Sequence, residues 1–120
     1  MSERREIGFR AWDTRELEMI PNVFDNFHGS GDLLQESRFI PMQYTGLKDK
    51  NGKEIYEGDI VQTVVTSEWD REVPRDEEAV IEWDGFQWWA KSIHTADWHE
   101  IYDYPWEIIG NIYENPELLK

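Results

Sequence analysis

The stretch QYTGLKDKNGKEIYEGDIV, residues 43–61, is the part of the chain that decides its fold. Within nineteen residues it contains a tight turn at Gly46, a strand, a second turn at Asn51-Gly52 and the start of another strand after Gly58-Asp59. Short runs with alternating apolar side chains, separated by glycine-containing dipeptides, are typical of β-hairpins. We therefore predict that this stretch forms a hairpin and that the following strand covers residues 60–66.

The charges around Asn51-Gly52 predict the register of this hairpin. A two-residue loop would place like charges opposite one another on both of the first rungs. A three-residue loop, residues 50–52 with Gly52 in the left-handed region, places opposite charges there instead. Cross-strand pairs differ by roughly 0.2–1 kcal/mol each, so the second register is favoured. Its predicted pairs are Asp49 with Lys53, Lys48 with Glu54, and Leu47 with Ile55.

A second hairpin is predicted at residues 79–93, with its turn at Asp84-Gly85. This dipeptide between alternating apolar residues favours a two-residue type I′ loop. On one face the loop would pair Trp83 with Phe86, Ile81 with Trp88, and Ala79 with Ala90, and we expect this face in the core. Trp89 falls on the opposite, polar face together with Glu82.

The remaining chain also follows a period of two more than a period of 3.6. We predict strands at residues 7–12, 17–20 and 106–113, a strand fragment at 23–27, and an acidic, mobile loop at 67–78. Asn115-Pro116-Glu117 is typical of a helix start, with room for about one turn. The expected fold is all-β or mainly β with minor helix, a small antiparallel barrel- or sandwich-like domain built from hairpins, covering residues 1–120 as a single domain.

The charge balance is strongly acidic, with 12 Lys and Arg against 26 Asp and Glu and a formal net charge of −14. Such a surface repels phosphate, so we expect no direct binding to nucleic acid and no binding to a membrane. The charge serves solubility in the simplest interpretation. In a more specific interpretation, the acidic surface imitates nucleic acid and fills the binding site of a basic protein.

Several function classes lack the residues that they need. The chain has no cysteine, which excludes disulfides and Cys-based metal sites. The first residues lack the apolar core of a signal peptide, and no stretch is apolar enough to span a membrane, so the expected location is the cytoplasm of a bacterial host. No serine lies in a nucleophile motif, and residues 29–32 lack a P-loop lysine. We predict no catalytic residues and no cofactor.

A metal site is also not expected. The histidines are His28, His94 and His99, and Asp97, Glu100 and Asp103 lie near the last two. A spacing of five places His94 and His99 on opposite faces of a strand. We therefore interpret them as exposed loop histidines beside a solvated acidic patch.

A candidate interaction surface combines the two tryptophans that do not fit a core position with nearby acids. Trp69 lies in the acidic loop and Trp89 on the polar face of a strand. Aromatic side chains rimmed by carboxylates suit a basic protein partner. The alternative is that these two tryptophans are covered by other parts of the protein or have no role in binding. The candidate residues are Trp69, Asp76, Glu77, Glu78, Glu82 and Trp89.

Three motifs carry a resemblance to a known family: FRAWD at residues 9–13, the stretch 43–61, and IGNIYENPELL at 109–119. In order and spacing they resemble the YopX-like family of bacteriophage and prophage proteins, across essentially the whole chain. The middle region, 62–105, departs most, because it is richer in tryptophan and acid. The resemblance implies an all-β, barrel- or sandwich-like fold and a phage accessory role, and it implies no catalytic residues.

Three functions remain open from the sequence. The leading one is a phage- or prophage-encoded, non-enzymatic acidic module that binds a basic host or phage protein. The second is a homo-oligomeric structural protein that pairs through strand edges and Trp89. The third is a carboxylate- or metal-dependent enzyme. Salt dependence of binding, light scattering and thermal shift with divalent cations discriminate among them.

Overall fold

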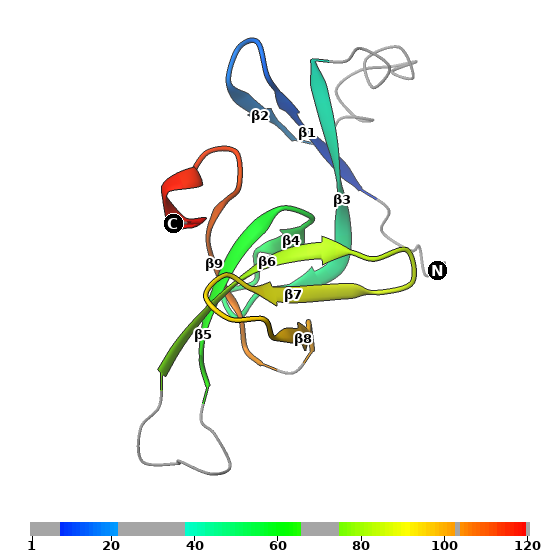
Figure 1. Cartoon of the computed structure of the whole chain (residues 1–120). Coiled ribbons are helices and arrows are strands. Elements are labelled where there is room, and N and C mark those ends of the chain that lie inside the picture. The colour runs from blue at the N-terminus through cyan, green and yellow to red at the C-terminus, as the bar shows by residue number, and fades with distance from the viewer. Residues whose placement is uncertain (1–7, 22–37, 66–74, 103, 120) are drawn as a thin grey trace, which may run out of the picture.

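The computed structural model describes residues 8–21, 38–65, 75–102 and 104–119, and its strands form two antiparallel sheets (Figure 1). One sheet has the order β2-β1-β3-β4 and the other β8-β7-β6-β5-β9. The predicted all-β fold with minor helix is confirmed. The elements are β1 (Phe9–Asp13), β2 (Glu18–Ile20), β3 (Phe39–Lys48), β4 (Glu54–Tyr56), β5 (Asp59–Val65), β6 (Arg75–Trp83), β7 (Trp88–Ser92), β8 (Trp98–Glu100), β9 (Glu107–Asn111) and the 3-10 helix η1 (Pro116–Leu119).

The hairpin of β3 and β4 has the register that its charges predict at the turn. Lys48 lies opposite Glu54, and Gly52 has a positive φ of 87°. The predicted pairing of Leu47 with Ile55 is wrong, because the next pair after Lys48 and Glu54 is Tyr44 opposite Tyr56. The two extra residues of β3 form a bulge around Gly46, whose φ is 86°.

β3 is longer than the predicted strand and pairs with two other strands. Its first half, from Phe39 to Gln43, pairs with β1, and its second half pairs with β4. The bulge at Gly46 lies within the second half. One continuous strand therefore pairs with β1 along its first half and with β4 along its second half.

The hairpin of β6 and β7 turns at the predicted place but in a different register. Trp83 lies opposite Trp88 and Ile81 opposite Ala90, so the loop has four residues rather than two. The Asp84 carboxylate accepts the backbone N–H groups of Phe86 and Gln87 at 2.7 and 2.8 Å. These bonds stabilise the longer loop, and they leave Phe86, predicted in the core, 91% exposed.

Two further predictions need correction around this hairpin. Residues 75–78 belong to β6 rather than to the acidic loop. The sequence did not indicate β8, which pairs with β7 at the edge of the sheet. The predicted strand fragment at 23–27 lies outside the described residues.

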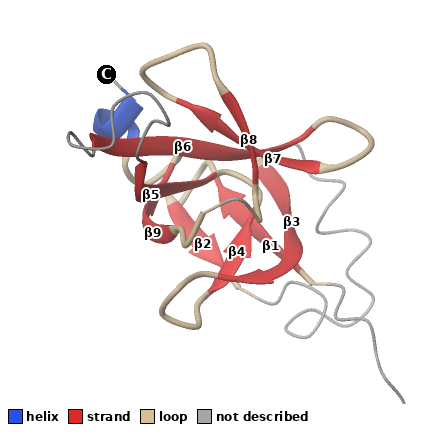
Figure 2. Ribbon diagram, turned by 90° about the horizontal axis from the view of Figure 1, so that it is seen from below, coloured by secondary structure: helices blue, strands red, loops and turns tan. Residues whose placement is uncertain are grey.

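The main core lies on one face of the second sheet, with β4 and the segment before β9 packed against it. Seven buried side chains form it: Ile55, Val61, Ala79, Ile81, Ala90, Ile101 and Trp106. A smaller cluster in the first sheet joins Ala11, Phe39 and Ile20. Figure 2 shows β5, β6, β7 and β8 of the second sheet above β1, β2 and β4 of the first.

A buried ion pair joins β1 to β5. Arg10 Nη2 donates to Asp59 Oδ1 at 2.5 Å, and its guanidinium lies 4.6 Å from the centre of the Tyr56 ring. Burial raises the pKa of Asp59, while the positive charge of Arg10 opposes that rise. Trp12 of β1 also stacks on Tyr113, after β9, at 5.7 Å. These contacts hold the first sheet against the second.

Candidate interaction surface

The side chains of β6 alternate between two faces of very different character. Ala79 and Ile81 point into the main core, whereas Glu78 and Glu82 point away from it. The ladder pairs Glu82 with Trp89 and Trp89 with Glu100, which extends the second face over β7 and β8. We call this second face the outer face, and its polar and aromatic residues are Asp76, Glu78, Glu82, Trp89, Lys91, Trp98 and Glu100.

Four of the six predicted surface residues lie together on the outer face: Asp76, Glu78, Glu82 and Trp89. The placement of Glu77 on this surface is wrong. Strand alternation turns Glu77 toward the core, and it is only 2% exposed. Trp69 lies outside the described residues.

Trp89 is anchored rather than freely exposed. Its indole N–H donates to Asp84 Oδ2 at 2.7 Å, and its ring meets Trp98 edge to face at 6.1 Å. Trp98 is the more accessible of the two, with 47% of its surface exposed. Lys91 Nζ lies 5.0 Å from the Trp98 ring centre, within the range of a cation–π contact. The outer face thus presents an aromatic pair that already holds one amine.

Sequence reasoning missed Trp98 because the strand that carries it has no alternating pattern. The segment Asp97-Trp98-His99-Glu100 reads as polar throughout apart from its tryptophan. Only its pairing with β7 shows that Trp98 lies opposite Lys91.

Asp84 closes the loop at the end of the outer face. The backbone N–H groups of Gln87 and Phe86 and the indole N–H of Trp89 stabilise its carboxylate, which lowers the pKa of Asp84. The ionised form of this side chain therefore fixes both the loop and the Trp89 ring.

On the core side of β6, Glu77 connects a small polar network. Its Oε1 accepts from Ser92 Oγ at 3.0 Å, and its Oε2 lies 2.9 Å from His99 Nε2. The His99 ring also packs edge-on against Tyr104, at 5.4 Å. The interpretation of His99 as an exposed loop histidine is wrong, since only 16% of its side chain is exposed. His94, which bonds to Glu78 at 2.8 Å, is half exposed.

Two side chains of this network and a third beside it could act as ligands of one cation. The nearest ligand atoms of Glu77, Asp97 and His99 lie within 4.8 Å of one another. However, Glu77 and His99 already contact each other directly, so a cation would have to replace that bond. The Ser92 hydroxyl donates to the Glu77 carboxylate, and its oxygen accepts the backbone N–H of Thr95 at 3.2 Å.

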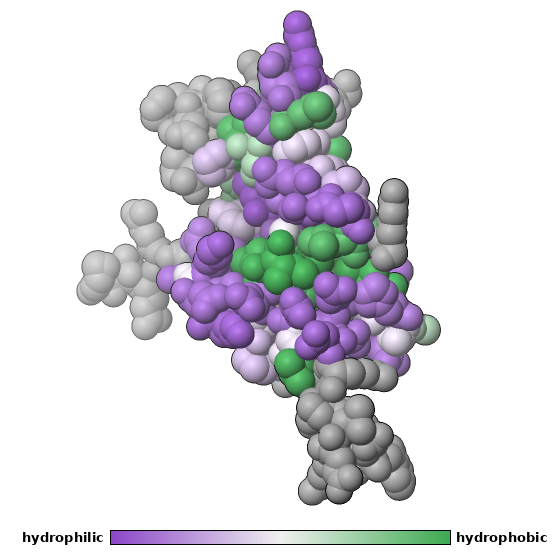
Figure 3. All heavy atoms as spheres, turned by 90° about the vertical axis from the view of Figure 1, so that its left-hand side faces the viewer, coloured by the Kyte–Doolittle hydropathy of each residue, from purple (hydrophilic) through white to green (hydrophobic). Residues whose placement is uncertain are grey.

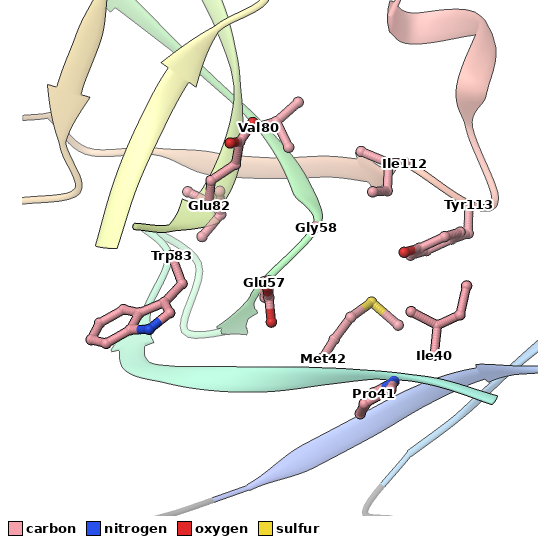
Figure 4. A pocket seen from close by; sticks show the side chains of 11 residues that line it. Ile40, Pro41, Met42, Glu57, Gly58, Val80, Glu82, Trp83, Ile112 and Tyr113 are labelled. Atoms are coloured by element: carbon pink, nitrogen blue, oxygen red, sulfur yellow. The ribbon is translucent and has the colours of Figure 1, made fainter. Parts of the chain in front are cut away.

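A groove of about 240 Å³ lies beside the outer face, between β3 and β6. Figure 4 shows Ile40 and Met42 rising from β3 while Ile112 and Tyr113 approach from the segment after β9. On one face of the molecule, Figure 3 shows an apolar patch between hydrophilic bands, with smaller apolar areas above and below it. The residues that line the groove are Ile40, Pro41, Met42, Glu57, Gly58, Val80, Ile81, Glu82, Trp83, Ile112 and Tyr113.

The polar groups of the groove are few and acidic. Glu57 and Glu82 are its charged residues, and the Tyr113 hydroxyl points into it (Figure 4). Burial raises the pKa of Tyr113, and the negative charge of Glu57 raises it further. The neutral hydroxyl can therefore donate or accept a hydrogen bond at any physiological pH. Glu82 also belongs to the outer face, so the groove and the outer face are continuous.

The fold and these surfaces define a small, two-sheet β domain whose exposed features are aromatic and acidic. The model of the YopX protein family matches residues 27–120, and the chain belongs to this family. It is similar to the crystal structure of protein EF1440 from Enterococcus faecalis, with a TM-score of 0.67, 29% identity, and coverage of 98% of this chain and 100% of that one.

A second solved structure, protein yopX from Bacillus subtilis, matches with a TM-score of 0.49 and 23% identity, over 93% of this chain and 95% of that one. No curated protein matches the chain. Among the described residues, no helix has the length and apolar character needed to cross a membrane.

Proposed function

We propose that this protein is a phage- or prophage-encoded accessory module of the bacterial cytoplasm that binds a basic host or phage protein and performs no catalysis. The resemblance to phage proteins supports the setting. The observation that carries the binding role is the outer face, where Trp89 and Trp98 lie beside Glu78, Glu82 and Glu100, with Asp76 farther along β6. Tryptophan is enriched at the residues that dominate binding energy in protein interfaces, and a rim of one charge sign favours a partner of the opposite sign.

A homo-oligomer is the second candidate, and the sheet edges are the observation that favours it. The edge strands are β2, β4, β8 and β9, of which β9 offers the longest edge with five residues and the other three have three residues each. Short edges are a common protection against pairing between copies. A net charge of −14 on each copy also opposes self-association. We therefore rank the binding module first.

The test is a pull-down from host lysate with the tagged protein, with and without nuclease, at low and moderate salt. We expect one basic protein to be enriched at low salt and largely lost at moderate salt, because rim charges are screened. The matched variant is Trp98→Ala, which removes an exposed ring while Trp89 stays anchored to Asp84. This variant should reduce the enrichment.

Two results would contradict the proposal. The first is capture that disappears after nuclease treatment, because the partner would then be held through nucleic acid. Capture that is indifferent both to salt and to Trp98→Ala would mean that the outer face is not the binding surface. Light scattering of the purified protein tests the oligomer separately, and we expect a monomer.

A further inference from the structure

We infer that the groove between β3 and β6 is a docking site for one lysine or arginine side chain of a basic partner. This inference rests on the proposed function and adds to it a second contact site, beside the outer face, and the chemistry of its occupant.

The shape and lining of the groove suit a side chain that is apolar along its length and cationic at its end. Ile40, Met42, Val80 and Ile112 give it apolar walls, and its volume is about 240 Å³. Lysine and arginine place a three- or four-carbon stem along apolar surface and keep the charged head at the rim. A purely apolar side chain would fill the walls but leave the rim groups unmatched.

The charges of the groove select a cation. Glu57 and Glu82 line it, and no lysine, arginine or histidine is among the lining residues of the described chain. Figure 4 shows Trp83 at the end of the groove near Glu57, and 45% of its surface is exposed. A cation that leaves the apolar walls there meets a carboxylate and an indole, the two kinds of group that bind guanidinium and ammonium.

The same charges argue against a second copy of this chain as the occupant. Two molecules that each carry a net charge of −14 repel one another. Backbone hydrogen bonds also connect the segments that form the groove. Gly58 N–H donates to Ile81 O at 2.9 Å, and Ile112 N–H donates to Gly58 O at 3.0 Å. Its floor is therefore held in place before any ligand arrives.

The experiment titrates the full chain with capped pentapeptides at low ionic strength, with nitrogen-15 NMR as the readout. The peptides carry two glycines on each side of arginine, lysine, citrulline or norleucine. Citrulline keeps the shape of arginine without its charge, and norleucine keeps only an apolar stem. We expect saturable shifts at millimolar concentration for arginine and lysine, centred on Trp83 and Gly58.

Removal of the two charges should weaken this binding. The double variant Glu57→Gln, Glu82→Gln preserves side-chain shape, and we expect it to lower the affinity by about tenfold, the scale of two exposed ion pairs. The control Glu100→Gln removes a charge from the outer face but does not line the groove, and it should change the affinity by less than about twofold. The tryptophan indole resonances report whether each variant is folded.

The inference would be overturned by equal binding of the citrulline peptide, by no loss in the double variant, or by shifts centred on Trp98. A dimer in light scattering that Trp83→Ala dissolves would also overturn it, since a second copy would then fill the groove. The lysate pull-down separates the two proposals. Equal capture by the wild type and the double variant would leave the binding module standing without the groove, whereas arginine binding without any capture would leave the groove without the module.

Discussion

Glu77 and Glu78 are neighbours in β6, yet one supports the fold while the other faces solvent. Glu77 is buried between Ser92 and His99, whereas the Glu78 side chain is 27% exposed and its partner His94 is half exposed. Both positions carry the same residue type, so the difference comes only from strand alternation. A core-facing carboxylate has exchanged all its water for protein partners, and loss of any partner is costly. An outward-facing carboxylate keeps water and gains little from its neighbour.

The largest predicted effect comes from replacing these two residues one at a time. Glu77→Ala removes one member of a buried polar network and should lower the free energy of unfolding by roughly 3 kcal/mol. Glu78→Ala should lower it by less than about 1 kcal/mol, the range of exposed pairs. Urea denaturation of both variants measures the difference. Equal losses would contradict the division of β6 into a structural and an outer face.

The second prediction concerns binding from the outer face. Trp98→Ala should weaken binding to a captured basic partner by at least about tenfold, as expected for a central aromatic residue of an interface. Its unfolding free energy should change by less than about 1 kcal/mol, because much of its ring is already exposed. Isothermal titration calorimetry measures the affinity, and the Phe86→Ala variant is the control for loss of an exposed ring in the loop at the end of the outer face. A partner that binds both variants alike would place its contacts elsewhere.

A smaller effect is predicted for Asp84, at the edge of the outer face, when the pH falls. The pKa of Asp84 is lowered from 3.8 in the folded protein, so its contribution to stability is present above this value and is lost as the pH falls through the folded pKa. Below that point the indole N–H of Trp89 should lose the negative charge of its acceptor, with a shift of its NMR resonance. In Asp84→Ala the transition should be missing. An unchanged transition in that variant would assign it to another carboxylate.

The smallest predicted effect is the response to divalent cations. We expect Mg²⁺, Mn²⁺, Ca²⁺ and Zn²⁺ to change the melting temperature by less than about 1 °C, because Glu77 and His99 already satisfy each other. A cation at a hundred times its dissociation constant would stabilise the native state by about 2.7 kcal/mol. A rise of several degrees that disappears in His99→Gln would instead favour a metal site at Glu77, Asp97 and His99.

Local rules predicted the turn of the first hairpin well, because the glycine and the charged residues beside it decide the register there. The positive φ at Gly52 and the pairing of Lys48 with Glu54 follow from residues within one turn. The second hairpin failed because the Asp84 side chain competes with the backbone for the loop N–H groups. That competition is visible in the sequence only as an aspartate at a turn, where both loop lengths are compatible with the dipeptide Asp84-Gly85.

The candidate surface could be predicted in part, and its errors have one physical source. Asp76, Glu78, Glu82 and Trp89 share a face, as strand alternation allows. The sequence predicts a loop at 67–78, and because a loop has no alternating faces, this prediction places Glu77 on the same surface. The groove could not be predicted at all, since β3, β6 and the segment after β9 meet only through long-range packing.

Gly58 gives this groove a property that matters for how the family could diversify. Its φ of 86° favours glycine, and its peptide groups link the turn after β4 to β6 and to Ile112. The floor is thus made of backbone, which most substitutions leave unchanged. Replacement of wall side chains such as Val80 or Ile112 would alter which residue fits while the scaffold stays intact. Under the proposed function, members of the family would in this way keep one scaffold while the partner side chain that fits the groove changes.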